Sequence, residues 1–341
     1  MGPGAAALAG AAASLAVAAA YAAAVAWAGP LDSPRARGLH SVPTVTSGGV
    51  AVIAGAGAGL LLFALCAPPP QPALARAALA LALAGGLGLL GAFDDLVDMG
   101  ARGKLLAQAL FGLLFTVMLG RIEVLPVAPG VTLTLGPVLG ALGTVLWLVV
   151  ATNAVNFMDG VDGLAAGSLA IALAALAIAA GGAGAPAVAG AALVGAGALV
   201  GFLPWNQPFR RLFQGDAGAL FSGFLAAGLA VIAADRVSVY FVPFALTPFL
   251  TDVLLTLLVR ARRGERLFEA HREHLFQLWL HKTGRTHQAL ALRVWAIMAL
   301  YALAALASQA APEGLRPLLF ALGVVVAAGF WRTARRRLTA P

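Results

Sequence analysis

Apolar runs long enough to cross a lipid bilayer recur from one end of this chain to the other. A helix needs roughly 18 or more mostly apolar residues to span a hydrocarbon core about 30 Å thick. The runs leave no stretch long enough for a soluble domain, and 61% of the residues are hydrophobic while 11% are charged. We therefore expect one all-α integral membrane domain over residues 1–341, because helices satisfy their own backbone hydrogen bonds in lipid.

Eleven spans are predicted between charged or Pro/Gly-rich breaks. The first run is longer than the apolar core of a signal peptide and has no Lys or Arg before it, so we expect it to remain as a span. The many small residues in these runs suit close helix packing in lipid. The predicted spans lie near residues 5–27, 48–66, 73–93, 104–120, 136–152, 163–181, 186–203, 217–234, 238–259, 288–308 and 314–331.

The basic residues are strongly biased to one side of these spans. Of the 22 Lys and Arg residues, all but Arg76, Arg121, Arg236 and Arg316 fall on that side. Positively charged loops stay in the cytoplasm, so the N-terminus is predicted outside and the C-terminus in the cytoplasm. The net charge of +8 is thus a topology signal and does not indicate nucleic acid, since the basic loops carry no interleaved aromatic platform.

Chemically active side chains gather on the same predicted side, although they did not set the orientation. Asp94, Asp95 and Asp98 end the third span. Neighbouring carboxylates repel one another, and a divalent cation or a basic partner stabilises their ionised forms. We expect Asp94 and Asp95 to be catalytic and metal-binding residues, with Lys104 contacting a phosphate. The alternative is a solvated, negatively charged helix end.

The segment after the fifth span carries Asn153, Asn156, Asp159 and Asp162 at intervals of three. On one unbroken helix such steps would spread the side chains around half the circumference. We therefore expect the glycines of this segment to break the helix and let both carboxylates face one pocket. We interpret the four side chains as substrate-binding residues. An ordinary Asx-rich turn remains the alternative.

Asp216 lies between two glycines just before the eighth span, at a predicted helix N-terminus. Glycine lets the backbone approach a ligand closely, and a helix N-terminus favours a nearby phosphate. Asp216 is the first candidate for a catalytic metal ligand. Mg²⁺ is the expected ion, with Mn²⁺ as a substitute, because hard cations prefer oxygen ligands. The alternative is an ordinary N-cap, for which Asp is a preferred residue.

The longest predicted cytoplasmic loop carries His271, Arg272 and His274. On a helix the two histidines would share a face, and we expect all three side chains to donate hydrogen bonds to phosphate. The loop has no His-Glu-x-x-His order, which speaks against a transition-metal site. Solvated surface histidines are the alternative. Asp252 differs because it lies inside the ninth span, where a buried acid indicates function or packing.

The order of these motifs resembles the polyprenyl-phosphate N-acetylhexosamine-1-phosphate transferase superfamily, from about residue 38 to residue 288. The resemblance implies a similar number of spans and a Mg²⁺-dependent cytoplasmic site in the inner (plasma) membrane. It also implies a UDP-sugar and undecaprenyl phosphate as substrates and UMP as product. The matching motifs are His40-Ser-Val-Pro43-Thr44, Gly48-Gly49-Val50, Asp94-Asp95-x-x-Asp98, Asn153-x-x-Asn156-x-x-Asp159-Gly-x-Asp162-Gly163-Leu164, Gly215-Asp216-x-Gly218 and His271-Arg272-x-His274.

Details of the motifs bear on the branch of this superfamily. The His-Arg-Glu-His order differs from the consecutive histidines of phospho-MurNAc-pentapeptide translocases. It looks like the branch that starts O-antigen, lipopolysaccharide or other surface-polysaccharide synthesis, so a UDP-N-acetylhexosamine is expected. The chain departs from the pattern at Thr46, Ala219 and Leu278, where relatives usually have Arg, Ser and Arg. A degenerate lipid-binding relative and a transporter are the alternatives, and the oligomeric state is open between monomer and homodimer.

Overall fold

A computed structural model of the protein describes residues 1–28, 31–32, 44–45, 48–67, 72–97, 99–267 and 271–340. For residues 28, 31–32 and 44–45 it describes the backbone alone. Ten of the described helices are long and apolar enough to cross a membrane. The predicted all-α integral membrane architecture is thereby confirmed.

The elements follow the predicted spans closely along most of the chain. They are α1 (Pro3–Ala28), β1 (Leu31–Asp32), β2 (Thr44–Val45), α2 (Gly48–Cys66), α3 (Pro72–Val97), α4 (Gly100–Leu119), β3 (Val124–Ala128), β4 (Val131–Thr134), α5 (Gly136–Met158), α6 (Leu164–Gly182), α7 (Pro186–Asn206), α8 (Gly215–Ala233), α9 (Phe241–Ala245), α10 (Thr247–Arg262), α11 (Leu275–Thr283), α12 (His287–Gln309), the 3-10 helix η1 (Glu313–Leu315) and α13 (Arg316–Thr339).

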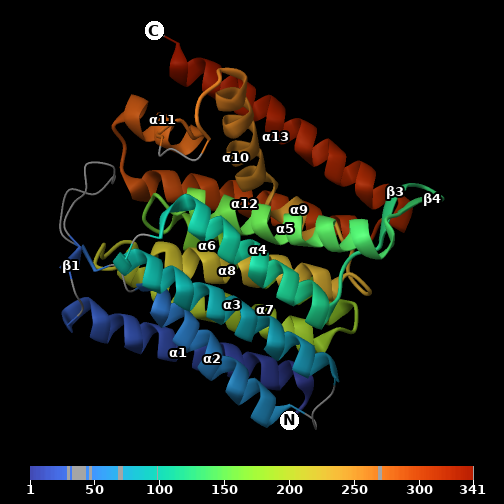
Figure 1. Ribbon diagram of the computed structural model, residues 1–341. Coiled ribbons are helices and arrows are strands. Elements are labelled where there is room, and N and C mark those ends of the chain that lie inside the picture. Colours follow the sequence, from blue (N-terminus) through green and yellow to red (C-terminus); the bar gives the residue numbers. More distant parts are fainter. Residues whose placement is uncertain are drawn as a thin grey trace.

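The long helices lie side by side, with α1 and α2 at one edge of the bundle and α12 and α13 at the opposite edge (Figure 1). α8 is the central helix and packs against α2, α3, α5, α6 and α7. Nearly every residue of α8 is buried, although its composition resembles that of the outer helices. The first turn of α8 is therefore enclosed by neighbouring helices.

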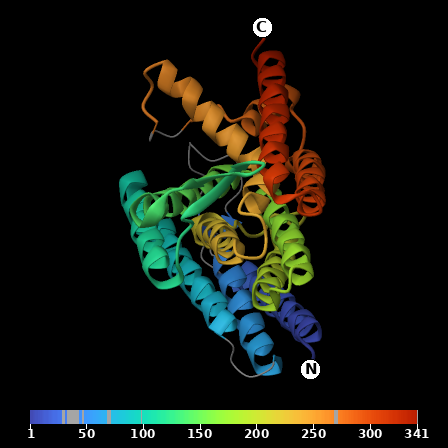
Figure 2. The same cartoon turned by 90° about the vertical axis from the view of Figure 1, so that its right-hand side faces the viewer.

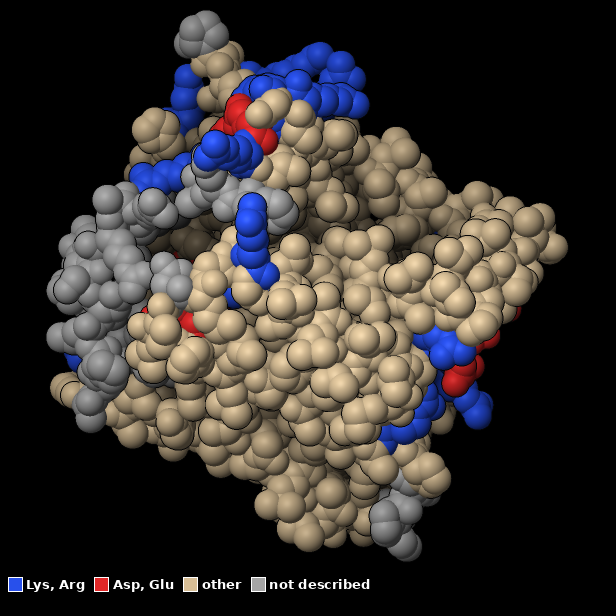
Figure 3. Space-filling model, in the orientation of Figure 1, with Lys and Arg blue, Asp and Glu red and all other residues tan. Residues whose placement is uncertain are grey.

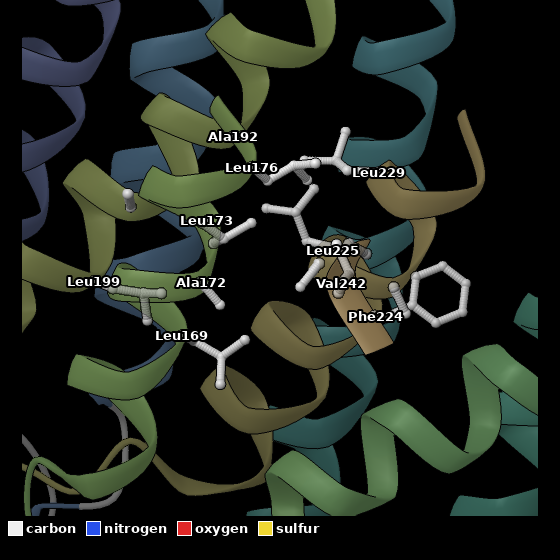
Figure 4. Packing of buried hydrophobic residues seen from close by; sticks show 14 of the residues in the cluster. Leu169, Ala172, Leu173, Leu176, Ala192, Leu199, Phe224, Leu225, Leu229 and Val242 are labelled. Atoms are coloured by element: carbon white, nitrogen blue, oxygen red, sulfur yellow. The ribbon is translucent and has the colours of Figure 1, made fainter. Parts of the chain in front are cut away.

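The core around α8 consists of leucine, alanine and phenylalanine side chains (Figure 4). Each leucine or phenylalanine side chain gains roughly 1.5–3 kcal/mol when it leaves water, although lipid replaces water as the reference here. Packing complementarity therefore contributes more to this core than the hydrophobic effect. The labelled side chains come from α6 (Leu169, Ala172, Leu173, Leu176), α7 (Ala192, Leu199), α8 (Phe224, Leu225, Leu229) and α9 (Val242).

Small residues bring α1 and α2 into backbone contact. A Cβ atom placed on Gly10 would lie 2.7 Å from the carbonyl oxygen of Gly59, which is closer than real Cβ atoms approach. The hydroxyl of Ser14 donates to the carbonyl oxygen of Val194 at 2.7 Å and ties α1 to α7 as well. Glycine at these crossings permits the close packing that drives helix association in lipid.

The ninth predicted span, residues 238–259, differs from the prediction because it is two helices. α9 ends at Ala245, and α10 begins at Thr247 with Pro248 in its first turn. Pro248 has no N–H to continue the hydrogen-bond ladder of α9, and its ring crowds the preceding turn, so the helix ends and restarts. α10 then leaves the bundle at a steep angle (Figure 2).

The two helices still carry the chain from the end of the bundle that holds β3 and β4 to the end that holds α11 (Figure 1). The N-terminus lies at the edge of the bundle formed by α1 and α2, and the C-terminus lies beyond the opposite edge, at the end of α13 (Figure 1). β3 and β4 form an antiparallel hairpin with Pro129 and Gly130 in its turn. Lys and Arg gather over the end near α11 and the C-terminus, separated by broad uncharged surface from a second charged group (Figure 3). Which end faces the cytoplasm stays a prediction.

Candidate active site

Four helix termini meet at the end of the bundle near α11, and they carry most of the predicted site residues. α3 and α5 end there, while α4 and α8 begin there (Figure 1). Contacts of α3 with α4 and α8, and of α5 with α4 and α8, hold these termini together. Asp95 and Asp216 are 121 positions apart in sequence and are nevertheless hydrogen-bonded neighbours.

Gly91 allows this meeting. A Cβ atom at Gly91 would lie 2.6 Å from the carbonyl oxygen of Asp216, so a larger residue would push α3 away from the first turn of α8. Asp94 and Asp95 follow within about one helical turn of Gly91. The close contact at Gly91 therefore places both carboxylates beside Asp216.

Lys104 links two of the predicted carboxylates. Its Nζ atom lies 2.7 Å from Oδ2 of Asp216 and 3.0 Å from Oδ2 of Asp94. The side chain of Asp94 is buried, and its Oδ1 accepts a hydrogen bond from the backbone N–H of Met99 at 2.6 Å. Asp94 and Asp216 thus converge on one cationic group, as the prediction of a basic partner or metal ion requires.

Asp95 has a different environment from Asp94. Its carboxylate accepts from the backbone N–H groups of Asp216, at 3.2 Å, and Ala217, at 3.4 Å. It therefore caps the N-terminus of α8 from the neighbouring helix α3, a favourable place for negative charge. Asp216 lies in the first turn of α8, at the helix N-terminus as predicted, but it is not the N-cap residue, and its side chain binds Lys104.

The amides of α5 divide into two roles. Asn156 donates from Nδ2 to Oδ1 of Asp216 at 2.8 Å. It therefore belongs with Asp94, Asp95 and Asp216, which together form the carboxylate cluster. Asn153 instead faces α4, where its Nδ2 donates to Oε1 of Gln108 and, at 2.9 Å, to the carbonyl oxygen of Val149. The structure thus brings Asn156 to Asp216 and places Asn153 in the packing between α4 and α5.

The turn after α5 breaks the helix where the sequence predicted. α5 ends at Met158, and Gly163 has a φ of +75°, a left-handed conformation that favours glycine. The N–H of Gly163 donates to Oδ1 of Asn206, and its carbonyl oxygen accepts from the Trp295 indole at 3.0 Å. These contacts fix the backbone directly after Asp162, the second acid of the turn.

The two acids point to different neighbours. Asp162 is buried, and its Oδ2 lies 2.8 Å from Nδ1 of His287 and 3.6 Å from Nε of Arg210. Burial raises the pKa of Asp159 well above its usual value, and the negative charges of Asp216 and Asp95 add to this effect. Asp159 therefore lies toward the carboxylate cluster, whereas Asp162 anchors the turn to α12.

His271 and His274 lie next to each other, although not on a helix. Their ring centroids are 4.8 Å apart, but residues 271–274 are irregular and α11 begins at Leu275. The predicted shared helical face is therefore wrong, while the predicted proximity is confirmed. The His274 ring also packs on Phe157 of α5, with a centroid distance of 5.5 Å. Phe157 follows Asn156. This contact therefore connects residues 271–274, the histidine loop, to the carboxylate cluster.

Both histidines are neutral at pH 7. Burial lowers the pKa of His271 to about 4, with the neighbouring His274 as the second cause. Burial likewise lowers the pKa of His274 to about 4, with the Arg335 guanidinium contributing. Nε2 of His271 and both ring nitrogens of His274 are buried without a hydrogen-bond partner among the described residues. A buried orphan nitrogen is costly unless a ligand satisfies it.

The remaining motif residues lie partly outside the described residues. Arg272 is exposed in the histidine loop. Asp98 and the motif residues His40, Pro43 and Thr46 lie outside the described residues. The departures at Ala219 and Leu278 lie within α8 and α11.

The oxygen donors of the cluster fit a magnesium ion of the kind that phosphate substrates carry. Within the described residues no three His, Cys, Asp or Glu side chains converge to hold a metal on their own. Mg²⁺ commonly uses one or two carboxylates, keeps several waters and takes further oxygens from substrate phosphates. Asp94 and Asp216 supply such a pair, because both already approach one cationic nitrogen.

Sequence reasoning missed three side chains of this region. Gln108 follows Lys104 by four positions and so shares its helical face, a signal that could have been used. Arg210 has a positive φ of 52° in the loop before α8, and His287 begins α12. No local pattern ties either residue to Asp162, since the three come together through tertiary packing.

A cavity of about 350 Å³ lies elsewhere, between the hairpin, α5, α8, α10 and α13. Its lining is almost wholly apolar and includes Trp147, Leu250 and Phe320. No carboxylate of the cluster lines it. It suits hydrocarbon and is not the place for a nucleotide.

Comparisons with known proteins find relatives of this chain. Residues 77–234 match the model of glycosyl transferase family 4. The phospho-N-acetylmuramoyl-pentapeptide-transferase of Mycobacterium tuberculosis (strain ATCC 25618 / H37Rv) is 34% identical over 187 residues, which are 50% of this chain and 51% of that protein. The enzyme of the same name from Mycobacterium sp. (strain KMS) is 31% identical over 252 residues, 63% of this chain and 69% of that protein.

This chain thus spans about half the length of the first of these relatives and just over two thirds of the second. The matched family region contains Asp94, Lys104, Asn156, Asp159 and Asp216. The similarity thus covers the carboxylate cluster itself as well as the membrane helices. The chain belongs to glycosyl transferase family 4.

Proposed function

We propose that this protein transfers a sugar-1-phosphate from a UDP-sugar to a polyprenyl phosphate, such as undecaprenyl phosphate, and releases UMP. The observation that carries the proposal is the pair Asp94 and Asp216 on one Lys104 ammonium, at the end of a membrane bundle of this family. An anionic cluster beside a cation suits a reaction between two phosphate groups, in which positioning and charge stabilisation dominate.

In the proposed reaction an oxygen of the lipid phosphate attacks the β-phosphorus of the UDP-sugar. A new phosphorus–oxygen bond forms to the lipid, and the bond from the β-phosphorus to the oxygen of the departing UMP breaks. A phosphate monoester with a second pKa of about 6 is largely dianionic at pH 7, so a strong base is not required. Asp95, held beside Asp216 by the N-terminus of α8, would orient this phosphate or accept its residual proton.

Mg²⁺ bound by Asp216 and Asp94 would neutralise the pyrophosphate and the leaving UMP. Lys104 would then turn from the carboxylates toward a phosphate oxygen, since its side chain is partly exposed. Asn156 holds the Asp216 carboxylate in one orientation through the 2.8 Å hydrogen bond. A fixed carboxylate keeps the charge arrangement preorganised for the transition state.

The remaining predicted residues divide between the nucleotide and the pyrophosphate. The turn with Asp159 and Asp162 is rigidly anchored and would bind the nucleotide end of the substrate. The neutral His271 and His274 would each donate one N–H to pyrophosphate oxygens, which would satisfy Nε2 of His271 and one of the two orphan nitrogens of His274. Arg272 would supply the positive charge that the neutral histidines lack.

For the donor we propose a UDP-N-acetylhexosamine, in an early step of surface-polysaccharide synthesis. The support is the spacing of His271 and His274 in the loop. The curated relatives above are named for phospho-N-acetylmuramoyl-pentapeptide transfer, which makes UDP-MurNAc-pentapeptide the competing donor. The apolar acceptor chain would leave the site through lipid, as the exposed apolar surfaces of α4 and α5 allow.

The test is UMP release by the full-length protein in lipid nanodiscs with polyprenyl phosphate and Mg²⁺. UDP-GlcNAc, UDP-GalNAc and UDP-MurNAc-pentapeptide would be compared as donors. We expect UMP release with an N-acetylhexosamine donor, its loss on chelation, and its recovery with Mg²⁺ or, in part, Mn²⁺. Release with none of the donors would overturn the transferase proposal and favour a degenerate lipid-binding protein.

The Asp216→Asn variant is the matched test of the site. It retains the size and an oxygen of Asp216 but removes the negative charge, so we expect a folded protein without turnover. Near-normal turnover by Asp216→Asn would remove this residue from the metal site. Preference for the pentapeptide donor would correct the donor alone and leave the transferase proposal in place.

A further inference from the structure

The histidine loop is too short and irregular to hold its own shape. Residues 271–273 form no helix or strand, and His274 is the N-cap of α11, whose backbone N–H bonds only locally, to Oε1 of Gln277 at 3.2 Å. The loop needs external contacts if His271 and His274 are to keep a fixed position. Its described anchors come from α10 and from the C-terminal part of α13.

The first anchor is Glu273, directly before His274. Arg335 of α13 donates from Nη1 to the carbonyl oxygen of Glu273, at 2.6 Å, and from Nη2 to its Oε2, at 3.0 Å. Arg260 and Arg263 of α10 bind the same carboxylate at 2.9 and 3.1 Å. Burial raises the pKa of Glu273, but the three guanidinium groups outweigh it and lower the pKa below its usual value.

The second anchor is Asp252, which holds the residue directly after His274. Both carboxylate oxygens of Asp252 accept from the backbone N–H of Leu275, at 2.9 and 3.1 Å. The indole of Trp331 on α13 donates to the same Oδ1 at 2.9 Å. Asp252 is buried in α10, so these partners explain how an acid is tolerated at that position.

Trp331 and Arg335 are four positions apart on α13 and thus share one face. The Arg335 guanidinium lies 5.2 Å from the Trp331 ring centroid, and both side chains are buried. One turn of α13 therefore holds the chain on either side of His274. Figure 1 shows this end of α13 beside α10 and α11. In the sequence, α13 lies far from the residues of the carboxylate cluster.

We infer that the C-terminal turn of α13 is a latch, in which Arg335 and Trp331 are positioning residues that hold the histidine loop in its substrate-binding place. The inference rests on the proposed function for the role of the loop, but the latch itself is a structural claim. Its consequence is that a helix outside the matched family region of residues 77–234 controls donor binding.

The variants are Arg335→Ala, with Arg335→Lys as the conservative change and Arg336→Ala as the matched control. Arg336 is exposed on the same helix and loses the same charge. In the full-length protein in nanodiscs, limited trypsin digestion would measure exposure of residues 260–285, which contain several Arg and Lys sites. We expect cleavage there to be about tenfold faster in Arg335→Ala and unchanged in Arg336→Ala.

Donor kinetics supply the second measurement. Loss of a charge-assisted hydrogen bond predicts a rise of roughly ten- to hundredfold in KM for the UDP-sugar, with a partial rise in Arg335→Lys. The KM for polyprenyl phosphate should stay near that of the parent. In a His274→Ala background, Arg335→Ala should add little, because the group that it positions is already absent.

Equal digestion of the Arg335→Ala and Arg336→Ala variants would overturn the latch whatever the activity of the protein. Faster digestion with an unchanged donor KM, or fully additive effects with His274→Ala, would overturn the positioning role. If the parent released no UMP, the proposed function would fail, while the digestion comparison would still decide the latch. Trp331→Phe, which removes one N–H and keeps the ring, tests the second anchor and should also speed digestion.

Discussion

The Nζ atom of Lys104 lies 2.7 Å from Oδ2 of Asp216, although 112 positions separate the two residues in sequence. The same nitrogen lies 3.0 Å from Asp94, so one ammonium compensates two carboxylates that would otherwise repel each other. Loss of the ammonium would leave like charges in a partly buried place. A divalent cation could compensate them instead.

Lys104→Gln should therefore lower thermal stability in the absence of metal, by about 1–3 kcal/mol, and Mg²⁺ should restore more stability to this variant than to the parent. Melting curves in detergent with and without Mg²⁺ would measure both effects. Lys282→Gln is the control, because Lys282 is exposed and bonds a backbone carbonyl near the C-terminus. The gain in stability from Mg²⁺ should be smaller in the double variant Lys104→Gln/Asp216→Asn than in Lys104→Gln. Equal gains would show that the ion does not bind at Asp216.

Asp95 has a structural role, as a cap of α8, and a proposed role in the reaction. Two substitutions distinguish these roles. Asp95→Ala removes the acceptor for the first N–H groups of α8 and should cost roughly 0.5–2 kcal/mol of stability. Asp95→Asn keeps one acceptor oxygen, so it should melt closer to the parent while losing most UMP release. Substantial turnover by Asp95→Asn would reduce Asp95 to a cap.

Arg272→Ala should weaken transition-state binding by roughly 1.5–3 kcal/mol, the scale of a hydrogen bond to a charged group. The Mg²⁺ requirement should not change, because Arg272 is not one of the proposed metal ligands. The ratio kcat/KM at several Mg²⁺ concentrations would measure both. The exposed Arg332 of α13 offers a charge-matched control. An unchanged ratio would remove Arg272 from the proposed pyrophosphate site.

The free energy of unfolding should decrease as the pH is lowered, over a range set by the pKa of His274 in the histidine loop. The folded pKa of His274 is about 4, whereas an unfolded histidine has a pKa of about 6.5. The unfolded chain then binds more protons between these values, so the contribution is complete above pH 6.5 and is lost as pH falls toward 4. At pH 5 the loss for His274 is roughly 2 kcal/mol.

His274→Phe removes this titration and keeps a ring beside Phe157 and Phe276. Its melting temperature should therefore change less between pH 7 and pH 5 than that of the parent. Parallel curves for the two proteins would contradict a depressed pKa at His274.

The orientation is a separate prediction that reporter fusions can check. A reporter after the last residue should behave as cytoplasmic, and one inserted at Gly130, in the hairpin turn, as external. The reverse pattern would place the carboxylate cluster on the outer face, away from cytoplasmic nucleotides. That result would not change the description of the fold, but it would exclude a cytoplasmic UDP-sugar as the donor.

Most of the membrane helices could be read from the sequence because hydropathy is a local and nearly additive property of each run. Local chemistry also predicted the helix break after Met158 and the position of Asp216 at the N-terminus of α8, since glycine acts on its own backbone. Pro248 is a position where this local reasoning failed. Its neighbours are apolar enough to read as one span, and the break at α10 was missed.

The identity of the acids at the site was also available from their pattern, but their individual tasks were not. Asp95 caps α8, Asn153 packs on Gln108, and Asp162 meets His287 only because distant helices are packed at particular rotations. Such pairings depend on close approaches such as that of Gly91 to Asp216, which no single segment encodes. Local sequence therefore determined which groups reach the membrane boundary, and tertiary packing decided which of them share a charge.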